Sequence, residues 1–230
     1  MNIANIFPAA DGYIEPDNGM PSMLSNNEKS LYYGTALGYT GHGEVIEFGP
    51  WLGSGTFQIC SALECTGLPW DVTVFDRFQW SKGYAERYKT IDLKPGDSFL
   101  PAFQQNLSPF ADHITPVTGE LIDLTSLLPF SANTKIEMIF IDAPKSWKML
   151  WLILNHVGPR LIEGATLVFQ DFLHITSRQL IWLLASVPEL RLTQVVESGT
   201  CASFVADGPI DNLEQTVPRS MEGMSEDDLI

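Results

Sequence analysis

Short apolar runs alternate with amphipathic stretches along most of the chain. Five runs have the length and composition of buried strands, namely 44–48, 71–76, 114–118, 136–142 and 165–169. Apolar residues recur at helical spacing in the stretches 25–37, 56–63, 121–128, 146–158 and 175–186. Parallel neighbours need crossover connections, and strands that are apolar on both sides need cover on both faces. The alternation therefore predicts an α/β fold with a doubly wound, mostly parallel sheet.

Two regions depart from this alternation. After Pro188, the apolar stretches 190–196 and 201–206 are separated by only four residues, which predicts a hairpin and an antiparallel edge to the sheet. The stretch 78–112 has the weakest pattern, although Phe99, Phe103 and Leu107 are spaced as on one helix face. We interpret the stretch 78–112 as a lid or a wall of a substrate site.

The ends of the chain set the expected domain limits. Residues 1–22 are rich in Pro, Gly, Asn and Asp, which predicts an irregular arm, and Ser25 and Glu28 then have the spacing of a capping box. We expect one domain over 23–208, because 230 residues suffice for one substantial core. Residues 209–230 are acidic and lack apolar periodicity, so we expect a solvated tail.

The charge balance excludes some partners. With 13 basic and 28 acidic residues the chain has a formal net charge of -15, which disfavours nucleic acid and anionic membrane surfaces as partners. No run approaches the length of a membrane span, and the first residues do not resemble a secretion signal. Cys60, Cys65 and Cys201 form no disulfide or zinc-binding pattern, so we expect a cytoplasmic location. The sequence is compatible with a homo-oligomer.

The most informative motif lies between the first predicted strand and the next helix. It reads Glu47-Phe-Gly49-Pro-Trp51-Leu-Gly53-Ser-Gly55-Thr56. Its glycines allow a tight turn and a close backbone approach to a ligand, and the following helix begins with free N–H groups. Neither a GxGxxG dinucleotide pattern nor a GxxxxGK[ST] phosphate loop is present. A small ligand that is not a dinucleotide or a triphosphate is therefore expected at the carboxyl edge of the sheet.

The spacing E-x-G-x-x-x-G-x-G-T resembles the first motif of class I S-adenosylmethionine-dependent methyltransferases. The resemblance is greatest to small-molecule and sugar O-methyltransferases of the macrocin O-methyltransferase type, and it covers residues 20–208. It implies a Rossmann-like, seven-stranded sheet of order 3-2-1-4-5-7-6, S-adenosylmethionine as cofactor, and methyl transfer to the hydroxyl of a small molecule or sugar.

The resemblance also implies roles for individual residues. Asp76 ends the second strand, where the family has an acid that binds both ribose hydroxyls, and Gly119 and Glu120 follow the third strand, where the adenine lies. Asp142 ends the fourth strand and corresponds to the acid that faces the methyl donor or the substrate. The implied cofactor-binding set is Glu47, Gly49, Trp51, Gly53, Gly55, Thr56, Asp76, Gly119, Glu120 and Asp142.

Departures from the family concern the metal and the base. Metal-dependent relatives have Asp-Gly-Asp-His after the fourth strand and Asp-Asp after the fifth, whereas this chain has Asp142-Ala-Pro-Lys145 and Gln170-Asp171. Two carboxylates are therefore missing, and we expect no required divalent metal. The candidate catalytic residues are Asp142, His174, whose imidazole can titrate near neutral pH, and Lys145, if its surroundings lower its pKa.

Each of these residues also has a structural interpretation. An acid at a strand end can cap the next helix or accept backbone N–H groups, and glycines favour any strand-to-helix turn. Trp147 and Trp151, one helical turn apart, are more typical of a core than of a substrate platform. A catalytically degraded methyltransferase that serves as a cofactor-binding or scaffold protein is the alternative function. A nicotinamide-dependent reductase is disfavoured, because both GxGxxG and a Tyr-x-x-x-Lys pair are absent.

Overall fold

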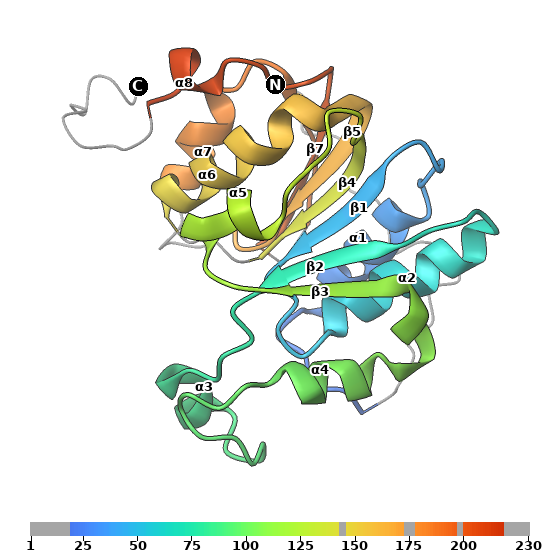
Figure 1. Ribbon diagram of the computed structural model, residues 1–230, viewed down its shortest axis with the longest axis vertical. Helices are drawn as coiled ribbons and strands as arrows, with labels where there is room; N and C mark the ends of the chain where they lie inside the picture. Colours follow the sequence, from blue (N-terminus) through green and yellow to red (C-terminus); the bar gives the residue numbers. More distant parts are fainter. Residues whose placement is uncertain (1–18, 143–145, 173–177, 197–199, 219–230) are drawn as a thin grey trace.

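The computed structural model describes residues 19–142, 146–172, 178–196 and 200–218. Its centre is a seven-stranded sheet in the order β3-β2-β1-β4-β5-β7-β6 (Figure 1). The strands are β1 (Glu44–Phe48), β2 (Val72–Asp76), β3 (Ile114–Thr118), β4 (Ile136–Ile141), β5 (Leu161–Phe169), β6 (Leu190–Val195) and β7 (Ala202–Ala206). The first five strands are parallel, and β7 is antiparallel to both β5 and β6. The predicted fold, strand order and terminal hairpin are confirmed.

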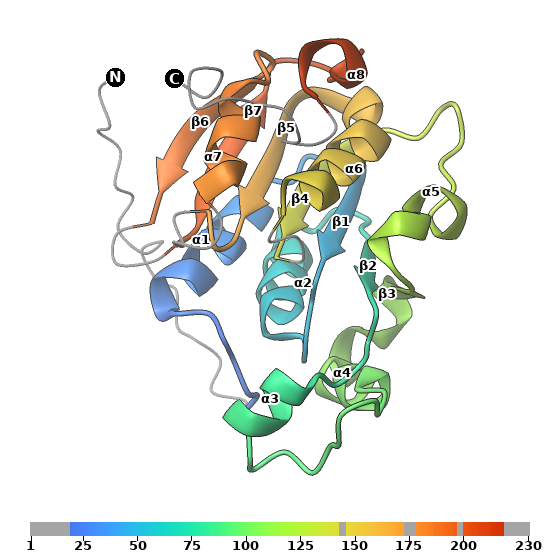
Figure 2. The same ribbon diagram turned by 90° about the vertical axis from the view of Figure 1, so that its left-hand side faces the viewer.

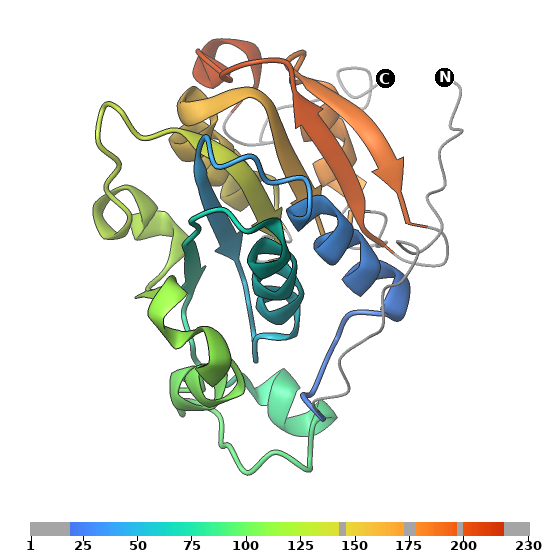
Figure 3. The same cartoon turned by 90° about the vertical axis from the view of Figure 1, so that its right-hand side faces the viewer.

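Helices cover both faces of the sheet, as Figures 2 and 3 show from opposite sides. The α-helices are α1 (Asn26–Ala36), α2 (Ser54–Thr66), α3 (Lys82–Arg87), α4 (Leu100–Asn106), α5 (Leu124–Leu127), α6 (Trp147–Val157), α7 (Arg178–Ala185) and α8 (Leu213–Thr216). The short 3-10 helices are η1 (Ser108–His113), η2 (Leu121–Asp123) and η3 (Gly158–Arg160). No helix in the described ranges is both long enough and apolar enough to cross a membrane.

The two core layers follow from the alternation of side chains along each strand. In β1, Val45 belongs to the cluster beneath α1, α2 and α4, whereas Ile46 and Phe48 belong to the cluster beneath α5, α6 and α7. Successive strand residues point to opposite faces, so a strand that is covered on both sides must be apolar at almost every position. This requirement explains why the central strands appear as continuous apolar runs in the sequence.

The chain stays packed beyond residue 208, where we expected the tail to begin. Ile210, Leu213 and Val217 are buried against the α6 face of the sheet. Trp147 and Trp151 lie in the same core, and their indole N–H groups donate to the carbonyls of Pro218 (2.7 Å) and Val217 (2.9 Å). These two bonds satisfy buried polar groups and fasten the segment 210–218 to α6.

The N-terminal helix begins where the sequence predicts. The Ser25 side chain accepts a hydrogen bond from the Glu28 backbone N–H (3.3 Å), and the Glu28 carboxylate accepts one from the Ser25 backbone N–H (2.8 Å). These reciprocal bonds form the predicted capping box. The short helices α3 and α8 lack a clear periodic signal in the sequence and were not predicted.

Candidate functional site

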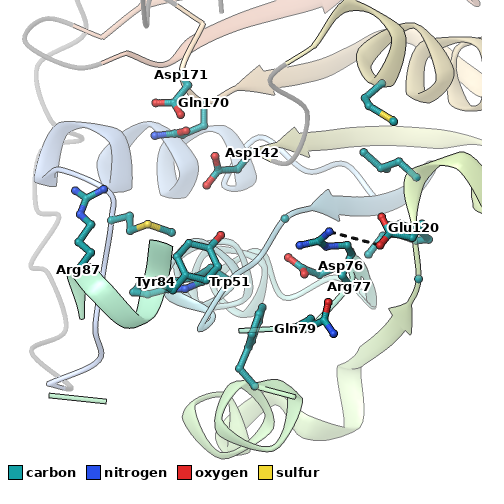
Figure 4. Close-up of a pocket in the computed structure, with 17 residues that line it drawn as sticks. Trp51, Asp76, Arg77, Gln79, Tyr84, Arg87, Glu120, Asp142, Gln170 and Asp171 are labelled. Atoms are coloured by element: carbon teal, nitrogen blue, oxygen red, sulfur yellow. Dashed lines mark hydrogen bonds and ion pairs between the residues drawn. The ribbon is translucent and has the colours of Figure 1, made fainter. Parts of the chain in front are cut away.

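A cavity of about 620 Å³ lies at the carboxyl edge of the parallel strands (Figure 4). A volume of this size is typical of small-molecule sites. Six of the predicted cofactor-binding residues line it: Gly49, Trp51, Asp76, Gly119, Glu120 and Asp142. They follow β1, β2, β3 and β4, so the parallel arrangement of the strands brings residues nearly 100 positions apart to one place.

The turn after β1 is shaped by Gly53 and Gly55. Gly53 has φ +96°, a conformation that residues with a side chain rarely adopt, and it is the N-cap of α2. A Cβ atom on Gly55 would lie 2.7 Å from Glu47 Oε1 and 2.9 Å from Tyr32 Cε1. The sequence motif therefore reflects two needs, which are a left-handed turn and close packing over the Glu47 carboxyl.

Glu47 lies below this turn rather than in the large cavity. It is buried, accepts a hydrogen bond from Thr56 Oγ1 (2.5 Å), and lines a small side cavity with Gly55. Burial raises the pKa of Glu47 to about 8, helped by the nearby charges of Asp142 and Asp76 and opposed by the Thr56 bond. Glu47 is therefore a largely neutral acid at pH 7, and Thr56 lines neither cavity.

Asp76 stands at the end of β2 and faces the large cavity (Figure 4). Its Oδ1 accepts the backbone N–H of Phe78 at 2.7 Å. Burial raises the pKa of Asp76 above its ordinary value, although the Phe78 bond and the Arg77 charge act in the opposite direction. One carboxylate oxygen thus holds the turn, and a carboxylate has further acceptor positions for a ligand.

The turn after β3 supplies the opposite wall of this part of the cavity. Gly119 donates its N–H to the Asp76 carbonyl at 2.9 Å, and a Cβ atom there would overlap the Leu127 side chain. Glu120 pairs with Arg77 across the cavity edge at 3.5 Å, and both side chains are exposed (Figure 4). The absence of a side chain at Gly119 therefore lets Leu127 of α5 pack closely against this turn, beside the carboxylates of Asp76 and Glu120.

The residues that follow β4 and β5 form a further side of the cavity, and they are Asp142, Gln170 and Asp171. Asp142 donates its N–H to the Phe48 carbonyl (2.8 Å), and Gln170 donates to the Ile141 carbonyl (2.9 Å), which extends the sheet to the cavity. Asp171 has φ +59°, and its Oδ1 accepts a hydrogen bond from Thr200 Oγ1 at 3.1 Å. Figure 4 shows Asp142, Gln170 and Asp171 side by side. The predicted catalytic candidates Lys145 and His174 lie outside the described residues.

Trp51 occupies an unusual position between the turn and α3. It has φ +47°, which is uncommon for a bulky residue, and it is buried. Its ring stacks on Trp80 (centroids 6.2 Å apart, planes at 15°) and also contacts Tyr84 (6.0 Å) and Tyr88 (4.7 Å). This aromatic cluster, Trp51 with Trp80, Tyr84 and Tyr88, joins the turn after β1 to the segment around α3.

Several cavity residues were missed by the sequence analysis. They come mainly from the segment before α1 and from the stretch 77–99, and they are Met23, Arg77, Gln79, Tyr84, Arg87 and Phe99. Residues between 79 and 99 in the stretch 78–112 thus line one side of the cavity. No spacing rule marks these residues, because they reach the site through contacts with residues distant in the sequence; the many aromatic residues of this stretch were the only available signal.

No group of three or more His, Cys, Asp or Glu side chains is placed to hold a metal within the described part of the chain. Asp142 and Asp171 both line the cavity, but their neighbour Gln170 is an amide and carries no charge. Hard cations prefer several anionic oxygens, which this wall does not assemble from its described residues. The arrangement instead suits an organic ligand, with carboxylates for hydroxyl groups and with apolar and aromatic side chains for a ring.

Several solved structures with a similar fold are O-methyltransferases. TomG from Streptomyces achromogenes, in complex with SAM, is 16% identical over 80% of this chain and 82% of that chain (TM-score 0.57). NovP is 14% identical over 80% and 81% (TM-score 0.60). An O-methyltransferase from Bacillus cereus, in complex with SAH, is 15% identical over 81% and 84% (TM-score 0.54). At these identities the likeness establishes the fold.

The sequence itself carries the family signal. No curated protein matches it. The family described as "Methyltransferase domain" matches residues 46–172, from the middle of β1 to the turn after β5, and this range includes most of the cavity residues. The chain therefore belongs to the methyltransferase domain family.

Proposed function

We propose that this protein binds S-adenosylmethionine and transfers its methyl group to a hydroxyl of a small molecule or a sugar. The observation that carries the proposal is the position of Asp76, a carboxylate at the end of β2 that faces the cavity between the glycine turns after β1 and β3. Two vicinal ribose hydroxyls are donors that one carboxylate can accept together. Gly119, Glu120 and Leu121 line the same cavity beside Asp76, which supports an adenine ring placed against the turn after β3.

The residues of the chain have distinct tasks in this proposal. The bound cofactor supplies an electrophilic methyl group. Asp76 and Glu120 hold the sugar and the base, and Gly49 and Asp142 border the space for the sulfonium end. The acceptor hydroxyl must be held in line with the methyl carbon, and the departing thioether needs no proton, so positioning supplies most of the rate enhancement.

A base assists by removing the hydroxyl proton during transfer. Asp142 lies at the cavity wall beside Gln170 and Asp171 and is the candidate that the structure describes. Lys145 and His174 follow the same two strands in the sequence and stay candidates. No divalent metal is required in this proposal, so transfer should survive EDTA.

The binding step is tested by calorimetry with S-adenosylmethionine and S-adenosylhomocysteine on Asp76→Ala and Asp76→Asn. Asn keeps an oxygen acceptor for the Phe78 N–H but loses the charge, so it separates the turn from the ligand contact. We expect Asn to weaken both ligands about tenfold or more and Ala to weaken them further. Asp112→Ala, at an exposed site away from the cavity, is the control. Unchanged affinity in both Asp76 variants would reject the ribose assignment.

The alternative is a degraded enzyme that keeps the pocket for binding, and the uncharged Gln170 at the cavity wall favours it. Labelled S-adenosylmethionine, incubated with panels of sugars and phenols with and without EDTA, divides the two functions. Transfer to any acceptor supports the enzyme, and transfer that EDTA abolishes would contradict the metal-free mechanism. Tight cofactor binding with no transfer to extracts or panels would favour the scaffold.

A further inference from the structure

Arg87 is a cation in the cavity that has no acidic partner among the described residues. It lies in the last turn of α3 and lines the cavity. The other arginine of the cavity, Arg77, is paired with Glu120 at 3.5 Å. Only 13 basic residues stand against 28 acidic ones in this chain, so a guanidinium that lines the site without a carboxylate is notable.

The aromatic cluster sets the position of this guanidinium. The Arg87 Cζ atom lies 5.4 Å from the centroid of the Tyr88 ring, and Tyr88 packs on Trp51 at 4.7 Å. Such stacking orients a guanidinium and leaves its N–H donors available at the edge of its plane. Arg87 is exposed and is oriented beside the cavity by the Tyr88 ring, while its hydrogen-bonding capacity stays available to a ligand.

The location of Arg87 separates it from the proposed cofactor contacts. Figure 4 shows Arg87 and Tyr84 at the α3 wall, whereas Asp76 and Glu120 lie at the other end of the cavity. The ribose and adenine would occupy that other end, so the α3 wall borders the space left for the acceptor. An anion entering a cavity with several carboxylates is repelled unless a cation is provided for it.

We propose that the methyl acceptor carries a carboxylate or a phosphate, and that Arg87 binds this group at the α3 wall. The inference rests on the proposed function, because it assigns the ribose and adenine to the Asp76 end. A guanidinium binds either oxyanion through two parallel hydrogen bonds, so both sources share one chemistry. With its anionic group bound to Arg87 at the α3 wall, the acceptor molecule extends its hydroxyl toward Asp142.

The test is calorimetry on the full chain saturated with S-adenosylhomocysteine, with two matched pairs of probes. The carboxylate arm compares 3,4-dihydroxybenzoate with catechol, and the phosphate arm compares glucose 6-phosphate with glucose. We expect the charged member of one pair to bind about tenfold tighter than its neutral analogue at low ionic strength, with the preference reduced by salt. The pair that shows the preference identifies the source of the anion.

Two variants locate the effect. Arg87→Ala should abolish the preference for the charged probe and leave the affinity for S-adenosylhomocysteine unchanged. Lys82→Ala removes the same charge from the same helix, but its side chain is 84% exposed, pairs with Glu86 and does not line the cavity. Lys82→Ala should retain the preference for the charged probe, because this preference requires direct contact with Arg87 rather than the long-range electrostatic field of the protein.

The outcomes that overturn the inference are distinct from those that overturn the proposed function. Binding of S-adenosylhomocysteine without a charge preference in either pair rejects the inference alone. An equal loss in Lys82→Ala, or weaker S-adenosylhomocysteine binding in Arg87→Ala, also rejects it; the second result assigns the guanidinium to the cofactor's own carboxylate. A wild-type protein that binds no S-adenosylhomocysteine rejects the proposed function and this inference together.

Discussion

At the scale of single residues, Glu47 illustrates how the binding turn depends on a buried acid. Its carboxyl lies under Gly55, is bonded to Thr56, and has a pKa of about 8. In the unfolded chain Glu47 has its ordinary pKa of 4.5 and releases its proton above that pH, whereas the folded protein keeps this proton up to about pH 8. Since the folded state binds more protons across this interval, the free energy of unfolding must fall as the pH rises from about 4.5 to about 8.

Replacing Glu47 with Gln should remove this pH dependence. Gln resembles the protonated acid and keeps an acceptor for Thr56 Oγ1. Each unit of pKa shift corresponds to about 1.4 kcal/mol. The free energy of unfolding of the variant, relative to that of the wild type, should therefore be higher at pH 8 than at pH 5 by up to a few kcal/mol. Urea unfolding at both pH values measures the difference. Glu163→Gln, at an exposed site on β5, is the control, and parallel pH profiles for wild type and Glu47→Gln would contradict the prediction.

Two glycines offer a matched pair for the packing over Glu47. A Cβ atom on Gly55 would lie 2.7 Å from Glu47 Oε1, whereas one on Gly34 in α1 has no neighbour within 4 Å. Gly55→Ala should lower the free energy of unfolding by about 1–3 kcal/mol through overpacking. Gly34→Ala should raise it by about 0.5–1 kcal/mol, because alanine favours a helix. Thermal unfolding checks the opposite signs, and stabilisation by both changes would show that the turn is less tightly packed than described.

At the scale of elements, the Glu28 carboxylate joins α1 to the segment that precedes β7. One oxygen accepts the Ser25 N–H (2.8 Å) and the other accepts the Thr200 N–H (3.0 Å). Thr200 Oγ1 in turn lies 3.1 Å from Asp171 Oδ1 at the cavity wall. The helix, the start of β7 and the cavity wall therefore share one hydrogen-bonded chain.

Glu28→Gln should loosen this connection. Burial raises the pKa of Glu28, but the bonds from Thr200 and Ser25 outweigh it and leave the pKa below its ordinary value. The stabilisation is therefore present above the unfolded pKa and is lost as the pH falls through the folded pKa. At pH 7 we expect the variant to lose about 1–3 kcal/mol in denaturant unfolding. Glu64→Gln, exposed on α2, should change little, and equal effects of the two variants would contradict the role of Glu28.

The elements also explain what the sequence could predict. Strand β1 and the capping box of α1 depend on local signals, which are a continuous apolar run and a four-residue spacing, and both were predicted. Asp76 was expected at the carboxyl edge of the sheet, because its place there depends only on the residue at which β2 ends. Helix α3 was missed, since it has no buried residue of its own.

The remaining differences come from contacts between distant parts of the chain. Arg87 reaches the cavity through Tyr88 and Trp51, which no local pattern reveals. The segment 210–218 contains only a short helix, and the carbonyls of Val217 and Pro218 that follow it accept bonds from Trp151 and Trp147, about 70 positions earlier. Tertiary packing decides such segments, whereas propensity decides little.

At the scale of the whole molecule, the net charge of -15 governs long-range encounters. A phosphate backbone is repelled by such a field, because binding to nucleic acid depends on releasing counterions with Lys and Arg. We expect no binding of labelled tRNA or duplex DNA at micromolar protein and about 0.15 M salt, as measured by fluorescence anisotropy. Micromolar affinity with a steep salt dependence would contradict this expectation and would point to a nucleic-acid acceptor.

The stretch 78–99 leaves and rejoins the domain at a narrow neck. Gln79 and Ser98 form an isolated antiparallel β-bridge. On either side of it, the Trp80 N–H donates to the Asp97 carbonyl (2.8 Å), and the Phe99 N–H donates to the Phe78 carbonyl (2.9 Å). Because the neck is closed by its own backbone bonds, changes in length or composition beyond it need not disturb β2 or the turn that follows it. The rings of Trp80, Tyr84 and Tyr88 still tie the stretch to Trp51. Under the proposed function, a transplanted stretch that keeps these three rings is therefore a direct route to altered acceptor choice.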